Sequence, residues 1–136
     1  MVENIHPLQV WDALQTNQDA RLVDVRTDAE WNFVGLPDLS QIGRDPVLIA
    51  WQLYPAMRVN NAFVDHLHRE GLEPQHHIYF LCRSGIRSLA AARAAQAAGF
   101  IHVYNVADGF EGQLDADGHR GSNSGWKADG LPWRQK

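Results

Sequence analysis

The chain has 136 residues, of which 45% are hydrophobic and 21% are charged, and this composition is typical of a globular protein that folds by itself around one core. Its formal net charge is -4, with 12 Lys and Arg against 16 Asp and Glu, which argues against nucleic acid and anionic lipid as partners. We therefore expect a single domain over residues 1–136 that binds neither nucleic acid nor a membrane.

Four short apolar runs have the length and the β-branched or aromatic content of strands. They are residues 21–26 (RLVDVR), 47–51 (VLIAW), 78–82 (IYFLC) and 102–106 (HVYNV). Apolar residues at helical spacing lie before and between these runs, namely Leu8, Trp11 and Leu14, then Phe63, Val64 and Leu67, then Leu89 in an alanine-rich stretch that stops at Gly99. This alternation predicts an α/β domain with a mainly parallel sheet and helices on both faces. In such sheets ligands bind beyond the carboxyl ends of the strands.

The first residues, Met1-Val2-Glu3-Asn4, have neither the positive start nor the apolar stretch of a signal peptide. The apolar runs are about one strand long, far below the roughly 20 residues of a membrane span. We therefore expect a cytoplasmic protein.

A Gly-, Ser- and Asp-rich stretch at residues 115–125 (DADGHRGSNSG) predicts a long surface loop. It opens like a calcium-binding loop, which would need a third Asp or Asn, a glycine in sixth place and a final Glu. Those places hold His119, Arg120 and Trp126. The sequence therefore argues against calcium.

Cys82 is the one cysteine of the chain, so an internal disulfide and a multi-thiolate zinc site are both excluded. It ends a predicted strand and precedes a predicted helix, whose free N–H groups and dipole favour a negative charge. Such a position favours the thiolate, which is the nucleophilic form. Gly85 allows the loop to curl so that its N–H groups converge on the sulfur. The alternative is a buried cysteine that packs as a small hydrophobe.

Two arginines flank this loop, at positions 83 and 87. Their planar guanidinium groups suit anionic oxygens such as those of thiosulfate. We expect Arg87 to bind a sulfur donor because it closes the loop. Arg83 is expected to point to solvent and to steer the donor.

The segment Cys82-Arg83-Ser84-Gly85-Ile86-Arg87 resembles the active-site loop of single-domain rhodaneses. Two further segments resemble the first and the closing signatures of that family, in the same order: residues 22–31 (LVDVRTDAEW), and residues 108–112 (DGFEG) with 126–132 (WKADGLP). An insertion at about residues 113–125 splits the closing signature. The resemblance implies a single rhodanese-like domain in which Cys82 carries sulfur as a persulfide. It also implies that the loop residues bind the substrate, namely Arg83, Ser84, Gly85, Ile86 and Arg87.

One segment departs from the family pattern. Residues 34–38 (VGLPD) stand where family members usually show Gly-His-Ile-Pro-Gly, so the histidine is missing. That histidine is not the nucleophile in the family, and the departure therefore concerns support of the fold more than the chemistry.

The expected activity is thiosulfate sulfurtransferase: a small anionic donor gives a sulfane sulfur to Cys82, which passes it to cyanide, a thiol or a protein acceptor. A persulfide carrier that delivers sulfur to one protein partner is an alternative. A cysteine phosphatase or arsenate reductase is disfavoured, because such enzymes place five residues between the cysteine and the arginine and this chain has four.

Other polar residues have a structural interpretation. Asp24 and Arg26 alternate on one strand face and are expected to pair with each other. Several histidines lie close in sequence without a carboxylate at ligand spacing, namely His66, His68, His76 and His77. We expect no metal and no cofactor.

Overall fold

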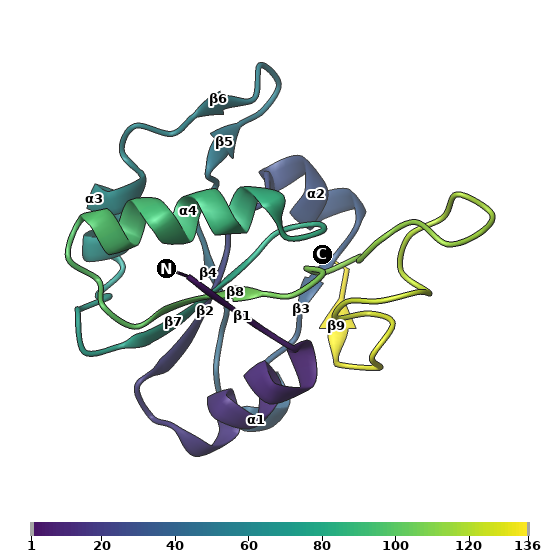
Figure 1. The fold of residues 1–136 in the computed structure, drawn as a ribbon, viewed down its shortest axis with the longest axis horizontal. Coiled ribbons are helices and arrows are strands. Elements are labelled where there is room, and N and C mark those ends of the chain that lie inside the picture. Colours follow the sequence, from purple (N-terminus) through teal and green to yellow (C-terminus); the bar gives the residue numbers. More distant parts are fainter. Residues whose placement is uncertain (1, 136) are drawn as a thin grey trace.

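The structure is a computed structural model that describes residues 2–135. Its central sheet contains five strands in the order β1 (Glu3–Ile5), β8 (Val103–Val106), β7 (His77–Leu81), β2 (Ala20–Asp24) and β4 (Val47–Leu48). All neighbouring pairs in this sheet are parallel. The predicted α/β architecture with a mainly parallel sheet is therefore confirmed (Figure 1).

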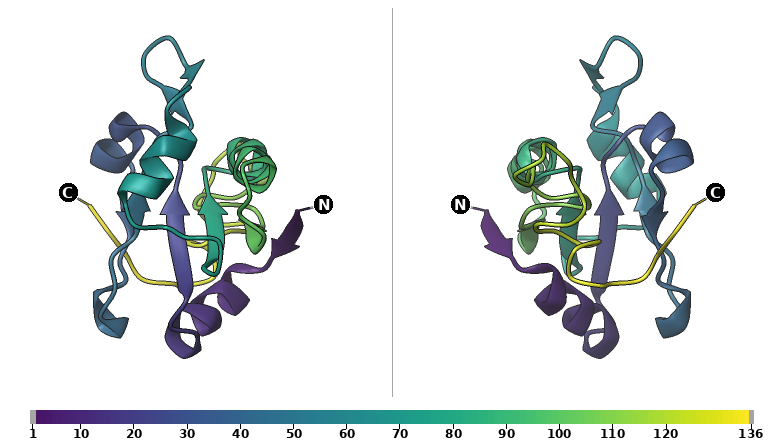
Figure 2. Two further views of the ribbon diagram at one scale, coloured as in Figure 1. Left: turned by 90° about the vertical axis from the view of Figure 1, so that its left-hand side faces the viewer. Right: turned by 90° about the vertical axis from the view of Figure 1, so that its right-hand side faces the viewer.

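Helices cover both faces of this sheet, as right-handed crossovers between parallel strands require. Two of them, α3 (Phe63–Arg69) and α4 (Ile86–Ala97), lie on one face, and α1 (Pro7–Thr16) lies on the other (Figures 1 and 2). The short helix α2 (Asp28–Phe33) follows β2. Among residues 2–135, none of the helices combines the length and the hydropathy that a membrane crossing requires.

Alternation along the central strands divides the apolar residues into two cores. Val23, Ile78 and Phe80 face α3 and α4, where they join a cluster that includes the fully buried alanines of α4. Leu22 and Leu81 face the other side and join a cluster with Val10 and Leu14 of α1. Burial on both faces explains why β2 and β7 are nearly continuous apolar runs.

Smaller elements complete the domain. They are the 3-10 turn η1 (Ser40–Ile42), the antiparallel pair β3 (Leu36–Pro37) with β9 (Trp133–Arg134), and the hairpin β5 (Gln52–Leu53) with β6 (Arg58–Val59). The hairpin projects beyond the layers of the domain (Figures 1 and 2). The insertion projects on the side where β7 ends and α4 begins (Figure 1).

The point where β7 leaves the sheet is held by the segment that follows β8. The Cys82 carbonyl accepts the N–H of Phe110 at 2.7 Å, and the Arg83 carbonyl accepts the N–H groups of Glu111 and Gly112 at 3.0 and 3.1 Å. We call these three hydrogen bonds the loop clamp. They satisfy carbonyls that have no further strand to pair with.

Gly109 allows this close approach. We expect Gly109→Ala to lower the melting temperature much more than Gly43→Ala. Both glycines have a left-handed backbone, with φ +62° and +69°, where a Cβ costs about 1–2 kcal/mol. A Cβ at Gly109 would in addition lie 2.4 Å from the Cys82 carbonyl oxygen, whereas one at Gly43 meets nothing within 4 Å. Thermal unfolding of both variants measures the difference in melting temperature. Equal melting temperatures would show that the close approach of Gly109 to the Cys82 carbonyl does not contribute to stability.

Candidate active site

Cys82 lies directly after β7, and its side chain points to the face that α4 covers. The loop from Arg83 to Gly85 then turns the chain into α4. Gly85 is the N-cap residue of α4 with φ 110°, a backbone conformation that a side chain would strain. The thiol is 1% exposed, so it lies beneath the loop at the amino end of a 12-residue helix.

Two donors contact the sulfur among the described residues. The Gly85 N–H lies 3.1 Å from Sγ, and the Ser88 hydroxyl lies 3.2 Å from it. Both groups are well placed to stabilise a sulfur anion, since they and the helix dipole direct positive charge at it. Of the loop N–H groups that were predicted to converge on the sulfur, that of Gly85 contacts it. The Ser88 hydroxyl is a second donor, which the sequence did not predict.

Ser88 is oriented by a second polar side chain. Its hydroxyl is also hydrogen-bonded to Asn105 Oδ1, at 2.5 Å. The Asn105 amide donates to the Gly85 carbonyl and to Asn4 Oδ1, which directs Oδ1 toward the hydroxyl. Because a hydroxyl has one proton, Ser88 donates either to Asn105 or to the sulfur. A charged sulfur favours the second arrangement.

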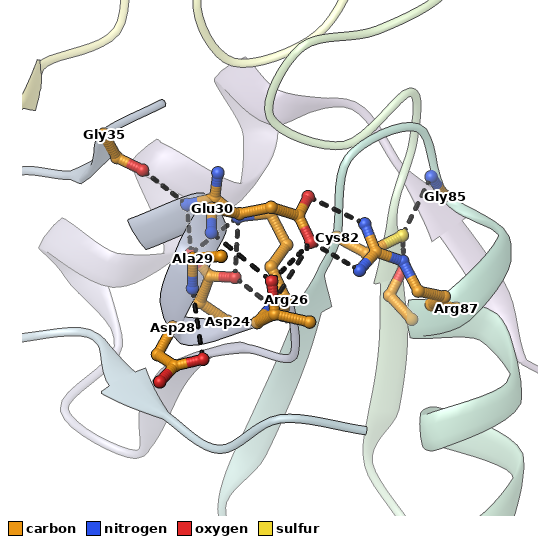
Figure 3. Close-up of polar contacts among 11 residues, drawn as sticks. Asp24, Arg26, Asp28, Ala29, Glu30, Gly35, Cys82, Gly85 and Arg87 are labelled. Carbon is orange, nitrogen blue, oxygen red and sulfur yellow. Dashed lines mark hydrogen bonds and ion pairs between the residues drawn. The ribbon is translucent and has the colours of Figure 1, made fainter. Parts of the chain in front are cut away.

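Arg87 forms an ion pair with Glu30 that local sequence does not predict. Its Nη1 and Nη2 donate to Oε1 and Oε2 of Glu30, at 2.6 and 2.9 Å (Figure 3). The helix that carries Glu30 is fixed by a capping box, in which Thr27 accepts the Glu30 N–H and Glu30 accepts the Thr27 N–H. The carboxylate is therefore held in place before it meets the arginine.

The charges of this pair affect both pKa values. Burial raises the pKa of Glu30, but the hydrogen bond and charge of Arg87 and the backbone N–H of Thr27 outweigh it and hold that pKa below its ordinary value. The hydrogen bond to Glu30 raises the pKa of Arg87, and the charge of Cys82 adds to this increase. Both shifts keep the two members of the pair charged.

A second, fully buried ion pair lies at the end of β2. The side chains of Asp24 and Arg26 are both fully buried. The Asp24 carboxylate accepts hydrogen bonds from Nε and Nη2 of Arg26 (Figure 3). Arg26 also donates to the Gly35 carbonyl and lies 4.3 Å above the Phe110 ring. The predicted structural pairing of Asp24 with Arg26 is confirmed, and it ties the segment without the family histidine to the core.

An open cleft of about 840 Å³ lies beside the loop. Arg83 and Arg87 line it together with Glu30. The hairpin contributes Gln52 and Met57, and the insertion contributes Leu114, Gly118, His119 and Arg120. Of the predicted substrate-binding residues, the structure thus brings both arginines to one cleft. Ser84 and Gly85 are half-buried, and the Ile86 side chain is 80% exposed.

The comparisons with known proteins agree with this geometry. A family profile described as the STR4 middle domain matches residues 6–136, and solved structures with the same fold are rhodanese-like proteins. This chain belongs to the STR4 middle-domain family of rhodanese-like proteins. The predicted resemblance to single-domain rhodaneses is therefore confirmed at the level of the fold.

Similar proteins span the whole rhodanese-like domain. The crystal structure of Rv0390 from M. tuberculosis is 50% identical, with a TM-score of 0.90 over 99% of this chain and 98% of that one. An uncharacterized protein of Rickettsia conorii, RC0915, is 38% identical over 98% of both chains. The polysulfide-sulfur transferase of Wolinella succinogenes is 22% identical, with a TM-score of 0.66 over 99% of this chain and 80% of that one, and shares the fold.

The Glu30–Arg87 pair predicts a pH-dependent stability. A carboxylate whose pKa is lowered on folding stabilises the protein above its unfolded pKa, near 4.5 for Glu30, and this stabilisation is lost as the pH falls through the lower folded pKa. We expect Glu30→Gln to lower the free energy of unfolding by about 1.5–3 kcal/mol at neutral pH and by progressively less in acid. Urea unfolding across this range measures the difference. Asp28→Asn on the same helix is the control, and a difference that persists in acid would contradict the ion pair.

The contact between Ser88 and Sγ leads to a separate prediction about the reactivity of Cys82. Ser88→Ala removes a buried donor to Sγ, so we expect the rate of Cys82 alkylation by iodoacetamide at neutral pH to fall about tenfold. Ser84→Ala, in the same loop, is the matched control and is expected to alkylate like the unmodified protein. Equal rates for the Ser88→Ala variant and the unmodified protein would show that Ser88 does not stabilise the thiolate.

Proposed function

We propose that this protein is a thiosulfate sulfurtransferase that carries the transferred sulfur as a persulfide on Cys82. The observation that carries the proposal is the contact of Gly85 N–H and Ser88 Oγ with Sγ at the amino end of α4. The same donors suit the thiolate and the terminal sulfur of a persulfide, because both species carry negative charge.

The reaction divides into two displacements at sulfur. The Cys82 thiolate attacks the outer sulfur of thiosulfate, the S–S bond of the donor breaks, and its electron pair leaves with sulfite. An acceptor, cyanide or a thiol, then attacks the terminal sulfur of the persulfide and releases the Cys82 thiolate. This order predicts ping-pong kinetics.

The arginines of the cleft have complementary roles in donor binding. A guanidinium group has five N–H donors, and Glu30 accepts one from each Nη of Arg87. The remaining N–H groups of Arg87 are available to the sulfonate oxygens of the donor. Arg83 is exposed in the same cleft and is free of carboxylate partners among residues 2–135, so it supplies the uncompensated charge that attracts the anion.

Two other functions would use the same cysteine. A persulfide carrier needs the same sulfur contacts, but it would load once and release sulfur only to its protein partner. A phosphatase needs a concavity that meets three equatorial oxygens. The Gly85 N–H is already 3.1 Å from the sulfur, and this short loop favours a sulfur-sized ligand over a phosphate.

Intact-protein mass spectrometry tests the proposal directly. After incubation with thiosulfate, we expect the protein to gain the mass of one sulfur atom and to lose it on addition of cyanide, with thiocyanate formed over many turnovers. Cys82→Ser is expected to show neither the gain nor the turnover while keeping the circular dichroism spectrum of the unmodified protein.

Three other outcomes would contradict the proposal, and each has a different meaning. Turnover by a folded Cys82→Ser variant would rule out the persulfide. Stoichiometric loading without turnover on any small acceptor would identify a carrier. Cysteine-dependent hydrolysis of an aryl phosphate, with no persulfide formed, would identify a phosphatase.

A further inference from the structure

The insertion forms a wall of the cleft that the active-site loop opens into. Residues 113–125 contribute His119 and Arg120 to its lining, and the hairpin contributes Gln52 and Met57. The insertion therefore has a position from which it contacts any ligand larger than the sulfur itself.

Hydrogen bonds hold this wall in a defined conformation. Asp115 accepts the backbone N–H groups of Asp117 and His119 and the hydroxyl of Ser122. The backbone N–H groups of His119 and Asp117 and the Ser122 hydroxyl together lower the pKa of Asp115, which is therefore ionised at neutral pH. The insertion is thus organised around one carboxylate.

The wall is also joined to the loop clamp. Gly121 donates its N–H to the Glu111 carbonyl at 2.7 Å, and Arg120 Nη1 donates to the Gly112 carbonyl at 2.7 Å. Glu111 and Gly112 are the residues whose N–H groups hold the Arg83 carbonyl. Arg120 is consequently fixed relative to the active-site loop by two adjoining sets of hydrogen bonds.

The charges of the cleft are unequal. Three arginines, Arg83, Arg87 and Arg120, line the cleft together with two glutamates, Glu30 and Glu111. Glu30 is paired with Arg87, whereas no carboxylate pairs with Arg83 or Arg120 within residues 2–135. Positive charge therefore gathers in this cleft although the chain as a whole has a net charge of -4. Such an arrangement favours an anionic ligand.

The cleft is also larger than thiosulfate needs. Its volume of about 840 Å³ falls within the roughly 300–1,000 Å³ of sites that enclose drug-sized ligands. Thiosulfate has only a handful of heavy atoms and would occupy the part next to Arg83 and Arg87. The remainder, between Met57, Leu114 and Arg120, suits a short organic group that bears a carboxylate.

We infer that the insertion forms a subsite for the organic part of an acidic persulfide donor, with Arg120 contacting a carboxylate of that donor. The inference rests on the proposed persulfide chemistry of Cys82. In the loading step the Cys82 thiolate attacks the outer sulfur of R–S–SH, the S–S bond breaks, and its electron pair leaves with R–S⁻. Cys82 is left as the hydropersulfide, and the R–S⁻ thiolate is the product that must leave the cleft.

Sulfur loading from matched donors tests this subsite. The donors are the persulfide of mercaptosuccinate, which has two carboxylates, and the persulfide of 2-mercaptoethanol, whose organic part is uncharged. Loading of Cys82 is followed by quenched intact-protein mass spectrometry as a function of donor concentration. We expect the unmodified protein to half-saturate at a lower concentration of the dicarboxylate donor, and Arg120→Gln to reduce this preference about tenfold, as expected for one lost charge-assisted hydrogen bond.

Two further variants separate charge from loop structure. Arg93→Gln removes the same charge from an exposed position on α4 outside the cleft lining and is expected to keep the full preference. Arg120→Lys retains the charge and is expected to keep most of it. If Arg120→Lys loses the preference as fully as Arg120→Gln does, the role of Arg120 is to hold the insertion, and the proposed carboxylate contact is wrong.

The remaining outcomes distinguish the two proposals. Equal half-saturation by the two persulfides in the unmodified protein, with loading from thiosulfate intact, would overturn the subsite and leave the sulfurtransferase proposal standing. Failure to load from any donor would overturn the sulfurtransferase proposal and the subsite with it.

Discussion

The carbonyl groups of Cys82 and Arg83 lie where β7 leaves the sheet, and they need hydrogen-bond donors that no neighbouring strand supplies. The N–H groups of Phe110, Glu111 and Gly112 meet this need. Because the donors belong to the segment after β8, the active-site loop can take its conformation only when β7 and β8 are paired and the chain has turned back across them. The position of the sulfur is therefore a consequence of the sheet, although its contacts are local.

Two ion pairs fix the elements around the cleft relative to the active-site loop. The buried pair of Asp24 and Arg26 fixes the end of β2 and, through the Gly35 carbonyl, the segment after α2. The half-buried pair of Glu30 and Arg87 then joins α2 to α4 beside the sulfur. Removing one partner of a buried pair leaves a charge without compensation, so each of these four residues constrains the others. Arg87 is in this way both a structural residue and a cation of the proposed donor site.

The sequence predicts much of this arrangement, and the limits of the prediction have physical causes. Apolar runs and helical spacing predict the main parallel strands and α1, α3 and α4, because burial imposes those periods. The strands β1, β3, β5, β6 and β9 have only two or three residues each, and such short sequences carry little periodicity. The capping box of Thr27 and Glu30 was a readable signal for α2. The approach of Asn105 to Ser88 and of Glu30 to Arg87 depends on strand order and on packing between elements, which local sequence does not encode.

The insertion is joined to the closing segment of the fold at one point. It begins and ends next to Gly112, where Gly125 approaches so closely that a Cβ there would lie 2.8 Å from the Gly112 nitrogen. The chain can therefore leave and re-enter the closing segment without disturbing the loop clamp. The hydrogen bonds to the sulfur come from Gly85 and Ser88, and neither residue belongs to the insertion. In the proposed mechanism, sulfur chemistry and donor selection therefore lie on separate segments, and a change in the cleft wall is expected to alter which donor is bound without altering how Cys82 holds the sulfur.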